Sequence, residues 1–222
     1  MLLELIKYLS EYFYTKDELI SASKVMAGQL EKYQALGVMP KPSYKVNLDV
    51  NCDSFFGEHE ELQELEFYAK GYASWLDDLL VLQHKFCQEI QFKNEVFKLF
   101  YLRYCSEQER LKSLGHVCND FKLVSEIDAY IKEAWGHFIQ GTYGLCTKSG
   151  LPEDIAAKAV AIFEINRLSE SDELSQAALT SLEKAVNLLD KSSALFAPHE
   201  RPRSSRHRLV NEIRRRFKLF AG

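Results

Sequence analysis

The chain has 222 residues, of which 46% are hydrophobic and 27% charged, a composition typical of a globular protein with a sizeable core. No apolar run approaches the roughly 18 residues needed to span a bilayer, and residues 2–14 do not have the pattern of a secretory signal. The net charge of −4 is uneven, because residues 199–222 carry +6 and the remainder −10. We therefore expect a cytoplasmic protein with no membrane span, whose basic tail faces its own acidic body or an external anion.

Five cysteines stand at positions 52, 87, 105, 118 and 146. Their number is odd, and they form no CxxC pair and no regular spacing. In a chain without an export signal, this pattern predicts free thiols.

The N-terminal region reads as a series of short helices. Apolar residues at helical spacing predict a first helix over residues 2–13. Thr15 is a favourable N-cap for a second helix, and Glu18 stands three residues later, as a capping box requires. This second helix is expected to end near residues 21–23.

The next helix carries Leu30 and Tyr33 on one face and is expected to end at Gly37. Pro40 and Pro42 exclude further helix, and strand signals are confined to about residues 44–50. Two helices joined by a tight turn, followed by an extended segment, predict a helix-turn-helix.

This stretch resembles the N-terminal DNA-binding region of MerR-type regulators. The resemblance rests on Thr15, Glu18, Leu19, Val25, Leu30, Tyr33, Leu36, Gly37, Val38 and Pro40. Tyr44 and Lys45 stand where those proteins have a Tyr-Arg pair in the wing. However, Lys24 replaces the turn glycine, and Glu31 replaces an arginine that meets the DNA backbone in the family. The remaining candidates for phosphate contact are Lys32, Lys41 and Lys45.

Residues 47–57 read as a linker, and we expect Phe55 and Phe56 at its end to pack into a core. A long helix is then predicted from Glu58 to Ile90. Its apolar residues are spaced by three and four, which would suit a dimerisation seam. The stripe is wider than a two-stranded seam, so burial inside a helical bundle is the favoured interpretation.

The remainder of the chain is predicted to be helical. The expected helices span residues 92–104, 125–138 with a cap at Ser125, 152–168 with Pro152 in the first turn, 171–189 with a cap at Ser171, and a final helix capped by Ser204 or Ser205 and carrying Leu209, Ile213, Phe217 and Phe220. A polar connection is expected over 111–120, a stop at 141–144, and a hinge between Pro198 and Pro202.

No nucleotide-binding loop, HExxH motif or GxSxG motif is present. Isolated pairs such as Glu133 with His137 could share a helix face, but no Glu-x-x-His pair of the di-iron type occurs. We therefore predict no metal site, and the sequence identifies no cofactor and no reaction.

Residues 135–146 mix aromatic, imidazole, amide, hydroxyl and thiol groups around three glycines. Such mixtures line ligand pockets, so this segment is the candidate small-molecule site. Its candidate ligand-binding residues are Trp135, His137, Gln140, Thr142, Tyr143 and Cys146. The alternative is a helix stop whose aromatic residues belong to the core.

The C-terminal tail combines cations with an apolar stripe. Its candidate anion-binding residues are Arg206, Arg208, Arg214, Arg215 and Arg216. Such a helix can meet phosphates or an acidic protein, or it can pack its stripe on its own acidic bundle.

The segments YTKDEL, GVMPKPSY, SFFG, the Trp-containing helix, GTYGLCT and SSRHRL together resemble an uncharacterised bacterial family associated with natural product biosynthesis, for which no activity is established. We predict an all-α fold with a helix-turn-helix subdomain (1–50), an irregular helical bundle (51–198) and a basic C-terminal helix (199–222). The first hypothesis is a non-enzymatic regulator or adaptor that contacts nucleic acid or an acidic protein. The alternative is an accessory protein or enzyme of natural product biosynthesis that binds a small molecule near residues 135–146.

Overall fold

The computed structural model describes residues 3–117, 124–171 and 173–219. Helices predominate, but the N-terminal region contains a three-stranded antiparallel sheet in the order β1-β3-β2. The fold is therefore mixed, and the prediction of an all-α protein is wrong. No helix in the described ranges is both long enough and apolar enough to cross a membrane.

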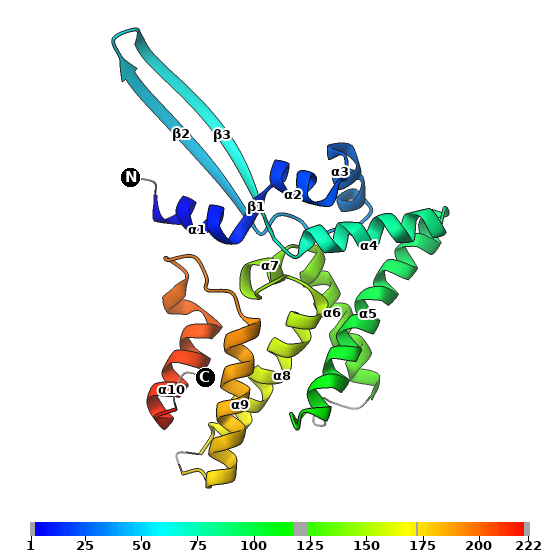
Figure 1. Cartoon of the computed structure of the whole chain (residues 1–222), viewed down its shortest axis with the longest axis vertical. Coiled ribbons are helices and arrows are strands. Elements are labelled where there is room, and N and C mark those ends of the chain that lie inside the picture. Colours follow the sequence, from blue (N-terminus) through cyan, green and yellow to red (C-terminus); the bar gives the residue numbers. More distant parts are fainter. Residues whose placement is uncertain (1–2, 118–123, 172, 220–222) are drawn as a thin grey trace.

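The N-terminal unit consists of α1 (Glu4–Tyr12), β1 (Phe13–Thr15), α2 (Lys16–Ser23), α3 (Ala27–Ala35), β2 (Tyr44–Ser54) and β3 (Gly57–Ala69). The helices that follow are α4 (Tyr72–Lys85), α5 (Glu89–Ser113), α6 (Val124–Ile139), α7 (Thr142–Cys146), α8 (Pro152–Leu168) and α9 (Gln176–Ser192). The tail contains a 3-10 turn (Arg201–Arg203), a π-helical turn (His207–Asn211) and α10 (Glu212–Phe217). Figure 1 shows this arrangement.

The predicted capping box is confirmed. The Thr15 hydroxyl accepts a hydrogen bond from the Glu18 backbone N–H (3.3 Å), and the Glu18 carboxylate accepts one from the Thr15 backbone N–H (2.8 Å). Gly37 has φ of 69° and ends the α3 segment as predicted. Local sequence signals thus fix the two-helix unit, with residues 24–26 between the helices.

The predicted helix from Glu58 to Ile90 is wrong in its first third and at its end, where α4 stops at Lys85 and Ile90 already belongs to α5. Residues 57–69 form β3, which pairs with β2 from Tyr44↔Phe67 out to Ser54↔Gly57, so strand structure is not confined to residues 44–50. Glutamate and leucine favour helix locally, but cross-strand pairing, which is non-local, decides the conformation here. The predicted boundary after residue 50 therefore falls inside β2.

Phe55 and Phe56 do not pack into a core. They form the tip of the β2–β3 hairpin, where their exposed fractions are 97% and 96%. The prediction for these residues is wrong because they occupy the turn of a hairpin that projects beyond the helices (Figure 1).

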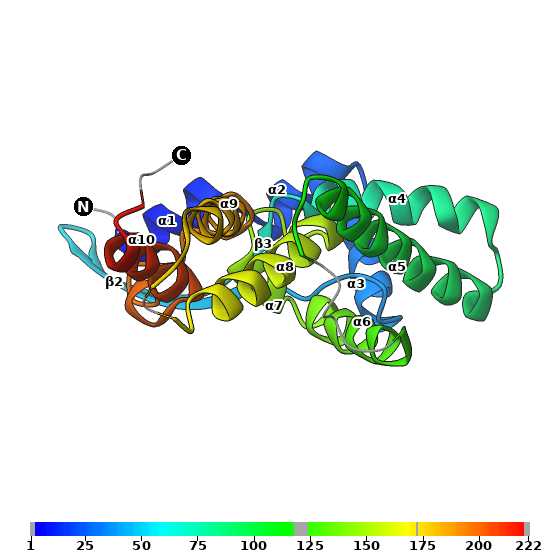
Figure 2. The ribbon, with the colours of Figure 1, turned by 90° about the horizontal axis from the view of Figure 1, so that it is seen from below.

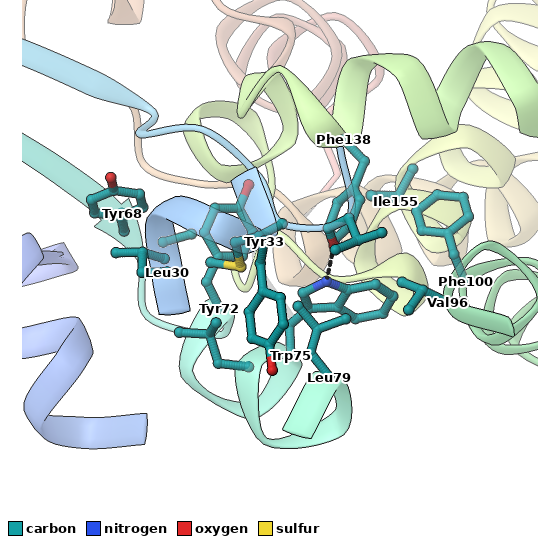
Figure 3. Close-up of a cluster of buried hydrophobic side chains, with 14 of the residues drawn as sticks. Leu30, Tyr33, Tyr68, Tyr72, Trp75, Leu79, Val96, Phe100, Phe138 and Ile155 are labelled. Atoms are coloured by element: carbon teal, nitrogen blue, oxygen red, sulfur yellow. Dashed lines mark hydrogen bonds between the residues drawn. The ribbon is translucent and has the colours of Figure 1, made fainter. Parts of the chain in front are cut away.

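The main core joins the two-helix unit to the later helices. Leu30 and Tyr33 of α3 are fully buried with Trp75 and Leu79 of α4 and with side chains of α5, α6 and α8. The Trp75 indole N–H donates to the Val38 carbonyl (2.9 Å), as drawn in Figure 3. The N-terminal unit therefore has no separate core on this side.

A second core lies between α8, α9 and the tail. Figures 1 and 2 both show α8 between the α4–α6 group and the α9–α10 group. Leu209 and Ile213 of the tail pack inward. This agrees with the predicted alternative in which the apolar stripe of the tail packs on the protein's own helical bundle. Ser204 caps the final helix by accepting from the His207 N–H (3.0 Å).

Other boundaries differ from the prediction. Helix α9 is capped by Ser175, whose hydroxyl accepts from the Ala178 N–H (3.3 Å), and not by Ser171, which hydrogen-bonds to Glu173. Helix α5 is longer than expected at both ends. The predictions for Cys118, for the Ser125 side chain and for Phe220 lie outside the described residues.

Candidate functional site

A cavity of about 400 Å³ lies between the end of α1 and the segment that follows α9. Its volume is within the range of small-molecule sites. It is lined by Tyr8, Tyr12, Phe13, Ala69, Gly144, Thr147, Lys148, Asp190, Lys191, Ser193, Ala194, Leu195 and Arg206. These residues come from well-separated parts of the chain, so the cavity exists only in the folded protein.

One wall of the cavity is aromatic. The ring centroid of Tyr8 lies 5.1 Å from that of Tyr12 and 5.9 Å from that of Phe13. Burial, assisted by the Glu200 carboxylate, raises the pKa of Tyr8 to about 12, so its phenol is neutral at pH 7. This wall is therefore uncharged and offers ring faces to a ligand.

The floor depends on a glycine. A Cβ on Gly144 would lie 2.2 Å from the Ser43 hydroxyl oxygen and 2.8 Å from the Tyr72 hydroxyl oxygen. Only glycine therefore lets α7 approach the root of the sheet this closely. The approach places the end of α7 beside the α1–β1 junction and closes the bottom of the cavity.

The opposite wall is held by backbone pairing. Thr147 and Ser193 form an antiparallel bridge, and the Lys148 N–H donates to the Ser192 carbonyl (2.9 Å). Ser193 is only 4% exposed, and its hydroxyl has no hydrogen-bond partner among the described residues. A buried hydroxyl without a partner is unfavourable, so Ser193 costs the folded protein some stability.

Cations dominate the charge of the lining. Arg206 and Arg214 both pair with Asp190, which neutralises that carboxylate. Lys148 and Lys191 are exposed, and neither makes an ion pair with another residue of the described ranges. The cavity thus combines an aromatic wall, a buried hydroxyl and two available ammonium groups.

Residues 96–218 match a family of unknown function, DUF6058. The chain belongs to this family. The DUF6058 region starts within α5 and ends just after α10, so it supplies Gly144, Lys148, Ser193 and Arg206 to the cavity. The aromatic wall lies outside it. Neither a curated protein nor a solved structure matches the chain.

None of the six predicted ligand-binding residues lines this cavity. Trp135 packs among Phe97, Phe100 and Phe138, with centroid distances of 5.2 to 5.6 Å. His137, Gln140 and Thr142 are exposed, and Tyr143 and Cys146 are partly buried. The nearest ring to His137 is Tyr143, at 6.2 Å between centroids. From residues 135–146, only Gly144 reaches the cavity.

Many of the predicted anion-binding residues already have partners. The Lys41 ammonium donates to the Gln140 amide (2.9 Å), Lys45 pairs with Glu66 (2.8 Å), and Arg216 donates to the Ser169 carbonyl (3.0 Å). Lys32, Arg208 and Arg215 are exposed. Of the predicted set, Arg206 alone lines the cavity, and Arg214 supports it through Asp190. Helices α3 and α10 lie on opposite sides of the molecule (Figure 1).

The sequence offers no local signal for most of this site. Tyr8 and Phe13 read as ordinary members of an amphipathic helix, and Ser193 follows α9 without any motif. Only the glycines of residues 141–144 point toward the region. No group of three or more potential metal ligands gathers within the described ranges.

Proposed function

We propose that the protein is a non-enzymatic adaptor that binds a small aromatic anion in the cavity lined by Tyr8, Ser193 and Lys191. The aromatic wall beside the exposed ammonium groups of Lys148 and Lys191 carries this proposal, because ring faces and cations together suit an aromatic anion.

The charge of the lining favours an anion. The ammonium groups of Lys148 and Lys191 are available, whereas the only carboxylate in the lining, Asp190, already pairs with Arg206 and Arg214. A carboxylate near these lysines would form charge-assisted hydrogen bonds, which are stronger than neutral ones. The aromatic wall would hold the remainder of the ligand.

Binding is better supported than catalysis. The lining contains no histidine, cysteine or glutamate, so Ser193 has no neighbouring base to activate it as a nucleophile. Asp190 is held by two arginines and is poorly placed to serve as a general base. The groups present can recognise a ligand but lack an acid–base pair.

The position of the cavity supports an adaptor role. One wall belongs to α1 and β1, and the other belongs to the DUF6058 region. A ligand in the cavity would contact both walls. It would therefore favour the relative position of α1–β1 and the DUF6058 region that fits it best. Binding could thereby be communicated to the N-terminal unit.

Duplex DNA is a poor partner for the same unit. Helix α3 exposes Glu31 and Lys32, and Glu31 already pairs with Lys16 (2.8 Å). The β2–β3 hairpin that follows the two-helix unit carries seven acidic residues against one lysine. Like charges on the hairpin and the phosphates oppose binding.

The test is the binding of 4-hydroxybenzoate, with neutral 4-hydroxybenzamide as the matched control ligand. Binding of each compound is measured by saturation-transfer NMR and by calorimetric titration. We expect the carboxylate to bind about tenfold more tightly than the amide, as one charge-assisted hydrogen bond would give. Lys191→Met should weaken binding of the carboxylate, whereas Lys184→Met, on the same helix but outside the cavity, should not. Ala194→Trp should fill the cavity and abolish binding.

Equal affinity for the two ligands, or loss of binding in Lys184→Met, would contradict the proposal. Ser193→Ala provides a second check, because it removes the hydroxyl without adding volume. We expect it to leave 4-hydroxybenzoate binding unchanged and the unfolding transition unchanged or slightly raised, since the hydroxyl is buried from the cavity and has no partner among the described residues.

A further inference from the structure

The β2–β3 hairpin forms a long arm, which we define as residues 44–69. Its eleven-residue strand β2 corresponds to about 37 Å of extended chain. Strand β3 pairs with β1 only at residues 67–69, so the outer part of the arm is a two-stranded ribbon. Figure 1 shows it projecting away from the helices. A projecting ribbon of this length presents its tip to other molecules.

The tip holds two phenylalanines in a defined geometry. The rings of Phe55 and Phe56 are edge-to-face, with centroids 5.5 Å apart. The Ser54 hydroxyl accepts from the Phe56 N–H (3.2 Å) and donates to the Gly57 carbonyl (3.3 Å), which fixes the turn. Two ordered and almost fully exposed aromatic side chains are unfavourable in water, and they suit an anchor for a pocket.

The surroundings of the tip are acidic. Asp53 and Glu58 face each other in the strand register, in the second pair below the phenylalanines. The arm's single cation, Lys45, is at its root and already pairs with Glu64 and Glu66. The tip is therefore an aromatic anchor flanked by carboxylates. An anionic lipid surface would repel it.

The cavity described above offers the complementary groups. Its aromatic wall of Tyr8, Tyr12 and Phe13 can pack against phenyl rings, and Lys148 and Lys191 can meet the flanking carboxylates. We infer that the tip of the arm binds in the cavity of a second copy of this chain. The inference rests on the proposed function of the cavity, because it uses the same aromatic and cationic groups.

A chain cannot place its own tip in its own cavity. Ala69, at the root of the arm, lines the cavity, whereas the tip lies twelve residues of extended strand away, or about 40 Å. The continuous pairing of β2 with β3 keeps the arm extended. Two copies that exchange arms reciprocally would satisfy both tips and both cavities, and this arrangement is a closed, two-fold dimer.

Arm exchange also gives the small ligand a regulatory effect. The aromatic anion and the tip compete for the same groups, so the ligand favours free chains with exposed tips. The ligand shifts the monomer–dimer equilibrium only as far as it binds the empty cavity more tightly than the cavity occupied by a tip. The adaptor would thereby change its oligomeric state, and the availability of its arm, in response to a small molecule.

Sedimentation velocity of the full chain tests the inference. We expect a reversible monomer–dimer equilibrium between about 10 and 100 µM, which the double variant Phe55→Ser/Phe56→Ser shifts to monomer by at least about tenfold. Ile90→Ser is the matched control, because Ile90 is a large exposed apolar residue (77%) away from the arm, and it should leave the equilibrium unchanged. A monomeric wild-type chain, or a dimer that survives loss of both phenylalanines, would overturn the inference.

Charge exchange supplies a second test. Asp53→Lys/Glu58→Lys reverses the charge at the tip of the arm, and Lys148→Glu/Lys191→Glu reverses the charge of the two lysine positions in the cavity. Each variant should be monomeric alone, because both of its sites are mismatched. Their mixture should form a heterodimer, because each arm then meets a cavity of opposite charge. If each variant still forms a homodimer, or the mixture stays monomeric, arm exchange is wrong.

The Phe55→Ser/Phe56→Ser variant separates this inference from the proposed function, because it keeps an unaltered cavity. If it binds 4-hydroxybenzoate while the wild-type chain is monomeric, the cavity function stands and the arm exchange falls. If the wild-type chain dimerises through its tips but the variant does not bind 4-hydroxybenzoate, the cavity is a protein-docking site and the small-ligand function falls.

Discussion

Replacing Gly144 by alanine should destabilise the protein through a clash at one point. The new Cβ would lie 2.2 Å from the Ser43 hydroxyl oxygen, 2.8 Å from the Tyr72 hydroxyl oxygen and 3.0 Å from the Ala69 Cβ. Tyr72 is fully buried and has little room to move. The Ser43 hydroxyl can move only by giving up its 3.1 Å hydrogen bond to the Gly141 carbonyl.

The loss of stability follows from these contacts. Overpacking a core by one methyl group costs about 1–3 kcal/mol, and the lost hydrogen bond adds about 1 kcal/mol. Gly144→Ala should therefore lower the free energy of unfolding by about 2–4 kcal/mol. For a chain of this length, that corresponds to a fall in Tm of about 4–16 °C.

Urea denaturation and calorimetry measure this effect, and Gly136→Ala is the matched control. Gly136 lies within α6, and a Cβ there would meet nothing within 4 Å. Alanine is the better helix former by about 1 kcal/mol, so the control should be neutral or stabilising. A Gly144→Ala variant within about 0.5 kcal/mol of the wild type would refute the close approach of α7 to the sheet.

Stability should fall as the pH rises from about 10 to 12, because Tyr8 ionises near the ordinary tyrosine pKa of 10.0 in the unfolded chain, whereas the folded chain retains the proton until about 12. Tyr8→Phe should reduce the slope of a thermal denaturation profile against pH by the share of one group, because Tyr68 and Tyr104 also have pKa values raised by burial and contribute to it; an unchanged slope would contradict the raised pKa of Tyr8. Trp75→Phe should lower stability by at least about 1–3 kcal/mol, because the buried Val38 carbonyl loses its donor, and a change below about 0.5 kcal/mol would contradict that bond. Fluorescence anisotropy should detect no duplex DNA binding at about 150 mM salt, since the arm is acidic; tight binding that Lys32→Ala abolishes would restore the DNA-binding hypothesis. Thiol titration of the unfolded, unreduced chain should find five free cysteines, and a count of three or one would indicate disulfides.

Local signals in the sequence predicted local structure well. Thr15 with Glu18, Gly37, and Pro152 in the first turn of α8 each act through the backbone within a few residues, and the structure confirms all three. The same holds for the cap at Ser204. Such signals need no knowledge of distant parts of the chain.

The arm could not be predicted from local signals. Residues 58–66 are rich in glutamate and leucine, which favour helix, and the spacing of Leu62 and Leu65 fits a helical stripe. Only pairing with β2 makes them a strand, and Leu62 is then 83% exposed. The turn that exposes Phe55 and Phe56 depends on the same pairing. Residues 47–57 alone therefore do not indicate that these two residues lie at an exposed tip.

The cavity could not be predicted from the sequence either. Its walls come from α1, β1, α7 and the end of α9, and the bridge between Thr147 and Ser193 joins residues 46 positions apart. The glycines of residues 141–144 did indicate a close approach, which Gly144 makes. The aromatic and histidine residues beside them, which suggested a ligand, instead pack into the core or face solvent.

Photoaffinity labelling with 4-azidobenzoate tests whether the cavity binds an aromatic anion, because it reports where such a ligand lies on the intact chain. We expect labelled peptides from residues 8–13 and 190–195, with labelling blocked by excess 4-hydroxybenzoate and lost in Ala194→Trp. Saturable labelling confined to the exposed side chains of residues 137–142, or labelling that Ala194→Trp leaves unchanged, would contradict this expectation.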